Sequence, residues 1–242
     1  MHIICYKTRN NFLILEEKHS LQPTPKPRVK ICCISSRQEA QMAIRYGASA
    51  LGLVSAMPSG PDVIEEAHIA HIAATFPPGV ASFLLTSQQD AHTVIEQQRR
   101  CRVNTLQLVD RFPIDSYKRL LEALPGIAIA QVIHVTGEES IEEAIAVAPY
   151  VHAILLDSGN PALTVKELGG TGRVHNWEIS RRIREVLDVP LFLAGGLNAE
   201  NVAQAIMTVR PFCIDICSGV RTNGKLDEEK LARFFHSVAQ AG

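Results

Sequence analysis

Short apolar runs alternate along this chain with longer amphipathic segments, and this alternation predicts the fold. Each short run is nearly continuous in β-branched or other apolar residues, as is typical of parallel strands covered on both faces. The eight predicted strands are residues 29–34, 50–54, 80–85, 105–109, 127–134, 153–156, 190–194 and 212–217. Helices with one apolar face are predicted between and after them, at residues 36–46, 64–75, 89–100, 114–124, 140–147, 177–187, 199–208 and 227–238.

Eight strands that alternate with eight helices predict a parallel α/β fold, and we expect a single (β/α)8 TIM barrel. An open doubly wound sheet is the alternative, but the count of eight and the placement of glycine motifs favour the barrel. The length of 242 residues also suits one barrel, for which about 250 residues is typical. Residues 1–28, which end in alternating prolines, are predicted to be a short N-terminal extension, and residues 29–242 to be the barrel domain.

Composition excludes several classes of partner. The formal net charge of -1 provides no electrostatic reason to expect nucleic acid or an anionic membrane. No apolar run approaches the roughly 18 residues of a membrane helix, and the first residues lack the order of a secretory signal. The six cysteines contain no CxxC pair, and the histidines do not cluster with them at ligand spacing. We therefore expect reduced thiols in a cytoplasmic protein and no metal site.

In a barrel of this kind, functional groups lie at the carboxyl ends of the strands, so candidate residues are expected there. The first strand carries Cys32, which faces the mouth if the strand alternates, and Lys30 would then share its inward face. Cys32 is a candidate base, although a buried cysteine is also a common small apolar filler. The sixth strand ends at Asp157, which is a candidate general acid if burial raises its pKa, or else a residue of an Asx turn.

Glycine-rich stretches follow the last three predicted strands. Barrels often bind phosphate between the loops after strands seven and eight, and glycines let backbone N–H groups approach an anion closely. Two such motifs in the expected order favour phosphate binding over simple tight turns. The predicted phosphate-binding residues are Gly170, Gly172, Gly195, Gly196, Ser218 and Gly219.

Four stretches of this sequence resemble the phosphoribosylanthranilate isomerase family. Residues 29–32 are similar to its first-strand Lys-hydrophobic-Cys motif, and residues 155–157 with 169–172 to its sixth-strand region. Residues 192–198 and 215–220 are similar to its seventh- and eighth-strand motifs. The resemblance runs from about residue 29 to residue 235. It implies an enzyme of tryptophan biosynthesis that catalyses an Amadori rearrangement of a phosphoribosylamine.

The resemblance also implies roles for individual residues. Cys32 matches the general base that removes the proton from C2 of the sugar, and Asp157 matches the general acid that opens the ring. Lys30 and Gln107, in the first- and fourth-strand motifs, are the expected substrate-binding residues. The reaction requires no metal or organic cofactor. The expected partner is a small phosphorylated sugar-amine substrate, with no nucleic acid and no membrane, and the expected assembly is a monomer or a homodimer.

Some positions depart from the family pattern. Cys33 stands where the family has glycine, and residues 55–61 contain no arginine to match its Ser-Pro-Arg motif. The fourth strand ends in Val109 and Asp110 in place of histidine and glycine, and Arg111 is a possible substitute for the missing arginine. Three hypotheses stay open: a divergent phosphoribosylanthranilate isomerase, a paralogue acting on another phosphorylated ribosylamine or amino sugar, and a non-catalytic barrel that binds a phosphorylated ligand.

Two further residues lie near predicted strand ends. His134 ends the fifth strand and is interpreted as structural, with a position facing the mouth as the alternative. Arg221 follows the eighth-strand motif and is interpreted as a solvated surface charge, with phosphate contact as the alternative.

Overall fold

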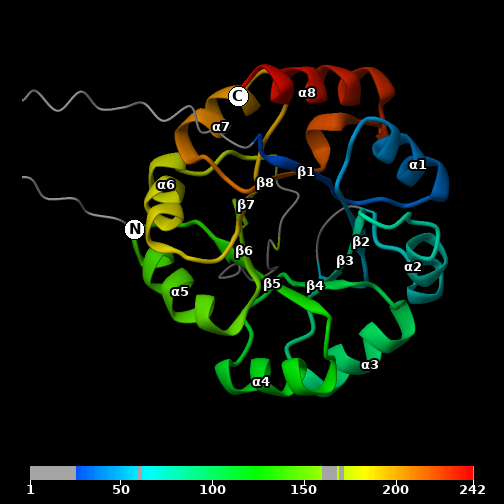
Figure 1. Cartoon of the computed structure of the whole chain (residues 1–242), viewed down its shortest axis with the longest axis vertical. Coiled ribbons are helices and arrows are strands. Elements are labelled where there is room, and N and C mark those ends of the chain that lie inside the picture. Colours follow the sequence, from blue (N-terminus) through cyan, green and yellow to red (C-terminus); the bar gives the residue numbers. More distant parts are fainter. Residues whose placement is uncertain (1–25, 59–61, 160–167, 169–171, 242) are drawn as a thin grey trace, which may run out of the picture.

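A computed structural model describes residues 26–58, 62–159, 168 and 172–241 of the chain. Eight parallel strands form a closed barrel in sequence order, with β1 hydrogen-bonded to both β2 and β8 (Figure 1). The strands are β1 (Arg28–Ile31), β2 (Ala50–Val54), β3 (Ala81–Thr86), β4 (Thr105–Leu108), β5 (Ala128–His134), β6 (Ala153–Asp157), β7 (Leu191–Leu193) and β8 (Cys213–Ile216). The α-helices are α1 (Arg37–Arg45), α2 (Glu66–Ala73), α3 (Ala91–Cys101), α4 (Ile114–Ala123), α5 (Glu139–Val147), α6 (Trp177–Val186), α7 (Val202–Val209) and α8 (Glu228–Gln240).

The elements agree with the predicted ones, so the (β/α)8 barrel is confirmed. Two boundaries differ by three residues: α7 begins at Val202 and not at residue 199, and β1 ends at Ile31 and not at residue 34. Cys33 has a φ of 63°, in the left-handed region, and this conformation turns the chain out of the strand. β1 also begins at Arg28, one residue before the predicted boundary, and the Lys26 Nζ donates to the carbonyl of Ala239 over 2.8 Å.

Side-chain caps explain several helix starts. Ser36 and Asp90 accept hydrogen bonds from the backbone N–H groups of Glu39 and Thr93, and Asp227 accepts from two N–H groups at the start of α8. Each such cap satisfies backbone donors that have no partner inside the helix and contributes about 1 kcal/mol. The capped helices pack around the barrel with their apolar faces inward.

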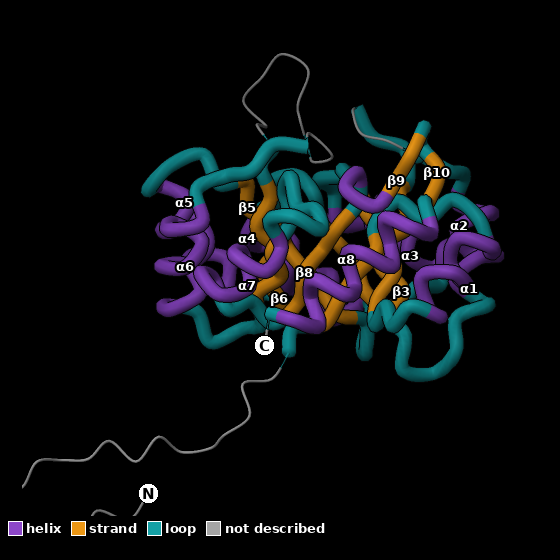
Figure 2. Tube along the Cα trace, turned by 90° about the horizontal axis from the view of Figure 1, so that it is seen from above, coloured by secondary structure: helices purple, strands orange, loops and turns teal. Residues whose placement is uncertain are grey.

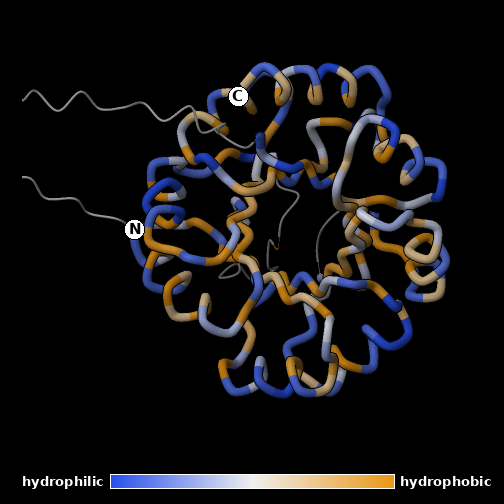
Figure 3. Tube along the Cα trace, in the orientation of Figure 1, coloured by the Kyte–Doolittle hydropathy of each residue, from blue (hydrophilic) through white to orange (hydrophobic). Residues whose placement is uncertain are grey.

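The core has two layers, which follow from the alternation of side chains along each strand. The outer layer lies between strands and helices and contains most of the buried aliphatic residues. The inner layer fills the barrel and includes Cys32, Val132, Leu155 and Phe192. Figure 3 shows the hydrophobic positions gathered on the strands and on the inner sides of the helices.

Two short elements at the carboxyl end of β8 were not predicted. A 3-10 turn, η2 (Ser218–Val220), leads into an antiparallel pair, β9 (Arg221–Thr222) and β10 (Lys225–Leu226). Figure 2 shows this pair rising beyond one end of the barrel. A further 3-10 turn, η1 (Ala148–Tyr150), follows α5. Among the described residues, no helix is both long and apolar enough to cross a membrane.

Candidate active site

Cys32 and Lys30 project into the barrel beside Gly52 of β2. A Cβ at Gly52 would lie 2.9 Å from the Cys32 Sγ and 3.1 Å from the Lys30 Nζ, so the glycine makes room for both groups. Lys30 is fully buried, and its Nζ lies 2.7 Å from the Asp215 Oδ2 of β8. The placement of Cys32 and Lys30 on one inward face agrees with the alternation expected from the sequence.

The neighbours of Cys32 favour its thiolate form. A hydrogen bond from the Cys33 thiol lowers the pKa of Cys32; burial opposes this shift and the Lys30 ammonium reinforces it. The pKa of Cys33 is raised well above its ordinary value by its own hydrogen bonds with Cys217 and Cys32 and by burial. Cys33 therefore remains a protonated donor, while Cys32 is the stronger candidate for a base.

The ammonium of Lys30 stays charged in this interior. Burial lowers the pKa of Lys30, but the Asp215 carboxylate and the nearby Cys32 raise it further, so the net shift is upward. A buried ion pair of this kind is costly to break, because either partner alone would be an uncompensated charge. The pair thus fixes a positive charge near the Cys32 thiol.

Asp157 ends β6 and lies opposite His134 of β5 in the strand register. Burial raises the pKa of the Asp157 carboxyl, against the opposing effects of a 2.7 Å hydrogen bond from the Ser158 N–H and of His134. A carboxyl group whose pKa is raised by burial holds a proton at higher pH and is suited to act as a general acid.

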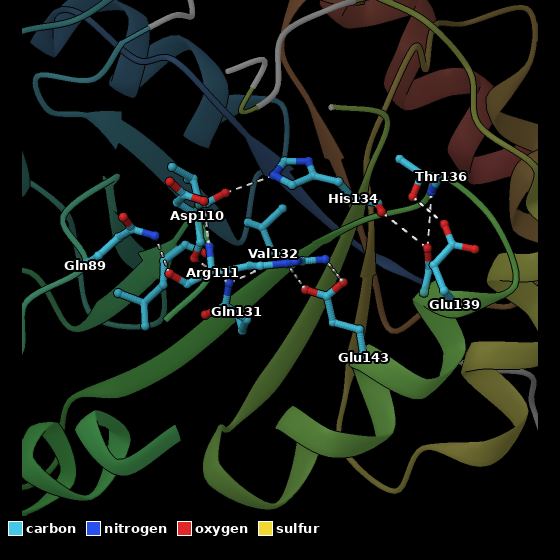
Figure 4. A network of polar contacts seen from close by, with 12 residues as sticks. Gln89, Asp110, Arg111, Gln131, Val132, His134, Thr136, Glu139 and Glu143 are labelled. Carbon is cyan, nitrogen blue, oxygen red and sulfur yellow. Dashed lines mark hydrogen bonds and ion pairs between the residues drawn. The ribbon is translucent and has the colours of Figure 1, made fainter. Parts of the chain in front are cut away.

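His134 lies on the inner side of β5, two residues beyond Val132 of the inner layer. Its Nε2 donates to the carbonyl of Val109 over 2.9 Å, while its buried Nδ1 has no hydrogen-bond partner among the described residues. Figure 4 shows the ring reaching from β5 toward the end of β4. The side chain of Arg111 is instead bonded to Glu143 of α5, at 3.1 and 3.2 Å. The guanidinium of Arg111 therefore forms a surface ion pair with Glu143.

The loops after β6, β7 and β8 converge through their glycines. A Cβ at Gly172 would lie 3.9 Å from the Ser218 Oγ, and one at Gly219 would lie 2.1 Å from the Leu197 carbonyl oxygen. Gly195 and Gly196 have φ values of 84° and 64°, which favour glycine. Gly170 lies outside the described residues.

Backbone donors are available where these loops meet. Among the described residues, the N–H groups of Gly195, Gly196, Ser218 and Gly219 donate to no backbone carbonyl. Successive unbonded N–H groups of this kind form anion-binding concavities. Nearby, the Nε2 of His175 lies 2.7 Å from the Ser180 Oγ, and burial lowers the pKa of His175 to about 4. His175 is therefore neutral near pH 7.

Gln107 of β4 is buried, and its Oε1 has no partner among the described residues. It alternates with Leu106 and Leu108 of the outer layer and lies in register with Leu85 of the inner layer, so it faces the barrel interior. An unpaired buried amide oxygen is costly, and it is a ready acceptor for a hydroxyl group.

The interpretation of Arg221 as a solvated charge is wrong. Arg221 is buried, and its Nη1 donates to the Glu39 Oε1 over 3.0 Å. Its Nη2 donates to the carbonyls of Cys32, over 3.2 Å, and of Cys33. The guanidinium therefore fastens the segment after β8 to the segment after β1, because its planar fork can satisfy several acceptors at once.

Asp215 and Gly52 also escaped sequence-based assignment. Asp215 lies in the predicted eighth-strand motif, but its pairing with Lys30 depends on barrel closure across 185 residues. Gly52 lies inside an apolar strand with no turn nearby. An isolated glycine in a strand indicates a close approach by another group, and Gly52 is such a glycine.

Comparison with known proteins supports this picture. The family model for N-(5'-phosphoribosyl)anthranilate (PRA) isomerase matches residues 29–237. An N-(5'-phosphoribosyl)anthranilate isomerase from Methanosarcina acetivorans is 33% identical over 226 residues, which are 88% of this chain and 93% of the relative. A second relative, N-(5'-phosphoribosyl)anthranilate isomerase 2 from Methanosarcina mazei, is 35% identical over 211 residues, with 86% and 92% of the two chains covered.

Solved structures agree with the sequence relatives. The crystal structure of phosphoribosyl anthranilate isomerase from Thermotoga maritima superimposes with a TM-score of 0.76 at 29% identity, covering 88% of this chain and 99% of that one. A phosphoribosyl anthranilate isomerase in complex with reduced 1-(o-carboxyphenylamino)-1-deoxyribulose 5-phosphate gives a TM-score of 0.74 at 27% identity, with the same coverage. The barrel fold, the family model that spans residues 29–237 and the relatives all agree. The chain therefore belongs to the N-(5'-phosphoribosyl)anthranilate isomerase family.

Proposed function

We propose that this chain is an isomerase that converts N-(5'-phosphoribosyl)anthranilate into the corresponding carboxyphenylamino-deoxyribulose phosphate in tryptophan biosynthesis. The observation that carries the proposal is the presence of two suitable groups at the carboxyl end of one barrel: the Cys32 thiol directly after β1, with a lowered pKa, and the Asp157 carboxyl at the end of β6, with a raised pKa. A lowered thiol pKa and a raised carboxyl pKa both move toward neutral pH, which suits a base and an acid that exchange protons with two sites of one substrate. Curated relatives named for this activity support the same conclusion.

In the proposed mechanism, Asp157 first donates its proton to the ring oxygen of the ribose. The C1–O bond breaks, and the nitrogen lone pair forms the C1=N bond of an open-chain iminium ion. The Cys32 thiolate then removes the proton from C2, and the electrons of that C–H bond neutralise the iminium as an enolamine. Tautomerisation of the enolamine to the ketone completes an isomerisation that consumes no external reactant.

We place the substrate phosphate at the glycine loops after β7 and β8. The unbonded N–H groups of Gly195, Gly196, Ser218 and Gly219 support this placement, because a dianionic phosphate satisfies several donors at once. Gly172 adjoins Ser218 and extends the same surface from the loop after β6. This cradle holds the end of the substrate that does not react.

We assign the remaining predicted residues from their surroundings. The unpaired Oε1 of Gln107 is suited to accept a hydrogen bond from a sugar hydroxyl in the interior. Lys30 is bonded to Asp215, so its proposed contribution is electrostatic, through the charge that it holds near Cys32. Both assignments concern how the substrate is held and how the base is kept ionised.

The activity is tested by adding purified protein to N-(5'-phosphoribosyl)anthranilate and following the loss of the substrate's fluorescence. We expect turnover by the unmodified chain and its loss in Asp157→Asn and in Cys32→Ser. Cys101→Ser is the matched control, because Cys101 is equally a buried free cysteine but lies at the end of α3. Absence of turnover at high enzyme concentration would contradict the proposal, as would failure to rescue a tryptophan auxotroph that lacks this isomerase.

We propose in addition that the chain works in the cytoplasm as a monomer or a homodimer. One solved relative from Thermotoga maritima is described as monomers generated from a dimeric phosphoribosylanthranilate isomerase, so both states occur in that protein. Light scattering coupled to gel filtration distinguishes the two assemblies for this chain.

A further inference from the structure

Two cysteine side chains meet at the carboxyl end of the barrel, where β1 and β8 close the sheet. The Sγ atoms of Cys33 and Cys217 lie 2.7 Å apart. Cys33 is buried, whereas Cys217 is partly exposed, and both are free thiols. The proposed mechanism uses neither side chain directly, although Cys33 adjoins Cys32 and Cys217 adjoins the proposed phosphate loop.

The backbone brings the two thiols to the same end of neighbouring strands. β1 and β8 run in register, with Ile31 opposite Ile216, and the Cys32 N–H donates to the Ile216 carbonyl over 2.8 Å. Cys33 and Cys217 follow these paired residues by one or two positions. Sulfur atoms in a disulfide are about 2.0 Å apart, so the thiols need to approach by only about 0.7 Å.

Arg221 holds both segments in place. Its guanidinium donates to the carbonyls of Cys32 and Cys33, and Arg221 follows Cys217 by one short turn. Its buried ion pair with Glu39 anchors the guanidinium itself. The two segments that carry the thiols are therefore held side by side.

We propose that Cys33 and Cys217 form a reversible oxidation site for small disulfides of the glutathione type, and that the crosslinked enzyme is the less active form. The thiolate of the more exposed Cys217 attacks one sulfur of the oxidised reagent, and a first reduced thiol leaves. The Cys33 sulfur, on losing its proton, then attacks the Cys217 sulfur of the mixed disulfide and expels a second reduced thiol. Two electrons pass from the cysteines to the reagent, and excess reduced thiol reverses both exchanges.

The expected loss of activity rests on the proposed function. Once Cys33 is in a disulfide it has no S–H, so it no longer donates the hydrogen bond that favours the Cys32 thiolate. The crosslink also ties down Cys217, the residue directly before the Ser218–Val220 turn. Loss of a hydrogen bond to a charged group predicts a fall in kcat/KM of about tenfold or more near neutral pH.

The test begins with fully reduced protein incubated with oxidised glutathione. Free thiols are then blocked with N-ethylmaleimide, and the digested protein is analysed by mass spectrometry. We expect a linked peptide pair that joins residues 33 and 217, with the mass of two hydrogens lost, and the same link in Cys32→Ser. We expect kcat/KM to fall about tenfold with crosslinking and to recover in dithiothreitol.

Each variant is scored against its own reduced activity. Cys217→Ser should resist oxidised glutathione, whereas Cys101→Ser should respond as the unmodified chain does. The proposal is overturned if no link forms between residues 33 and 217, if the linked enzyme keeps full activity, or if Cys217→Ser is inhibited equally through an adduct on Cys32. Failure of the proposed function would show separately, as an absence of turnover by the reduced protein whatever the peptide map contains.

Discussion

The close approach of the loops after β7 and β8 permits a sharp test of the proposed phosphate site. In Gly219→Ala, the new Cβ would lie 2.1 Å from the Leu197 carbonyl oxygen, whereas Cβ contacts below 3.0 Å essentially do not occur. The two loops must therefore separate by about 0.9 Å. Misplacement by about 1 Å costs about 10²-fold in kcat/KM, which is about 2.7 kcal/mol of transition-state stabilisation.

Most of this loss should appear in KM. The phosphate does not change during the reaction, so its contacts stabilise the bound substrate and the transition state equally. Initial rates from the fluorescence assay separate kcat from KM, and urea denaturation reports whether the variant is folded. A folded Gly219→Ala enzyme with an unchanged KM would refute the placement of the phosphate at this loop.

Gly224→Ala is the matched control. Gly224 has a φ of 77°, and a Cβ there would have no heavy atom within 4 Å, so the substitution adds backbone strain without a clash. We expect a loss of about 1 kcal/mol in the free energy of unfolding and a kcat/KM within about twofold of the unmodified enzyme.

Three further predictions concern charge and chemistry. Lys30→Met leaves Asp215 as a buried unpaired carboxyl and should lower the free energy of unfolding by about 3–5 kcal/mol. Urea denaturation measures this loss, and a change below about 1 kcal/mol would contradict the buried pair. Burial raises the pKa of Glu39, but hydrogen bonds from two backbone N–H groups and from Arg221 lower it to a net value below the ordinary 4.5. Its contribution to stability is therefore present above pH 4.5 and lost as the pH falls through the folded pKa; Glu39→Gln should cost about 2 kcal/mol at pH 7, with the difference narrowing in acid. Cys32→Ala should lose at least about 10²-fold in kcat while its thermal midpoint stays close to that of the unmodified chain, and retention of kcat would exclude Cys32 as the base.

Much of the fold could be predicted because it depends on local patterns. Buried parallel strands and amphipathic helices have distinct apolar spacings, and each predicted element has a counterpart in the barrel. The early end of β1 could not be predicted from that spacing, since residues 32–34 are as apolar as the strand before them. The turn at Cys33 requires a positive φ, and glycine, which favours that conformation, is absent there.

The proposed site was predictable in part for the same reason. Cys32 lies within the second half of a predicted strand, and Asp157 and the glycines follow predicted strands, where barrel enzymes concentrate their chemistry. The pairing of Lys30 with Asp215 and the role of Arg221 depend on contacts across the closed sheet, and no local pattern encodes them. An arginine beside a glycine turn is most often solvated. The burial of Arg221 and its ion pair with Glu39 become evident only in the three-dimensional structure.

The contact between β1 and β8 has a consequence for how this protein is made. The residues around β1 are made early, but the partners of Lys30, of the Cys33 thiol and of the Cys32 carbonyl arrive 184 to 189 residues later. Contacts of such long sequence separation form slowly, because a large loop must close before they are gained. A nascent chain that lacks its last quarter therefore carries Lys30 without its counter-charge and the segment after β1 without the guanidinium that fastens it, so we expect enzymatic competence to mark complete synthesis.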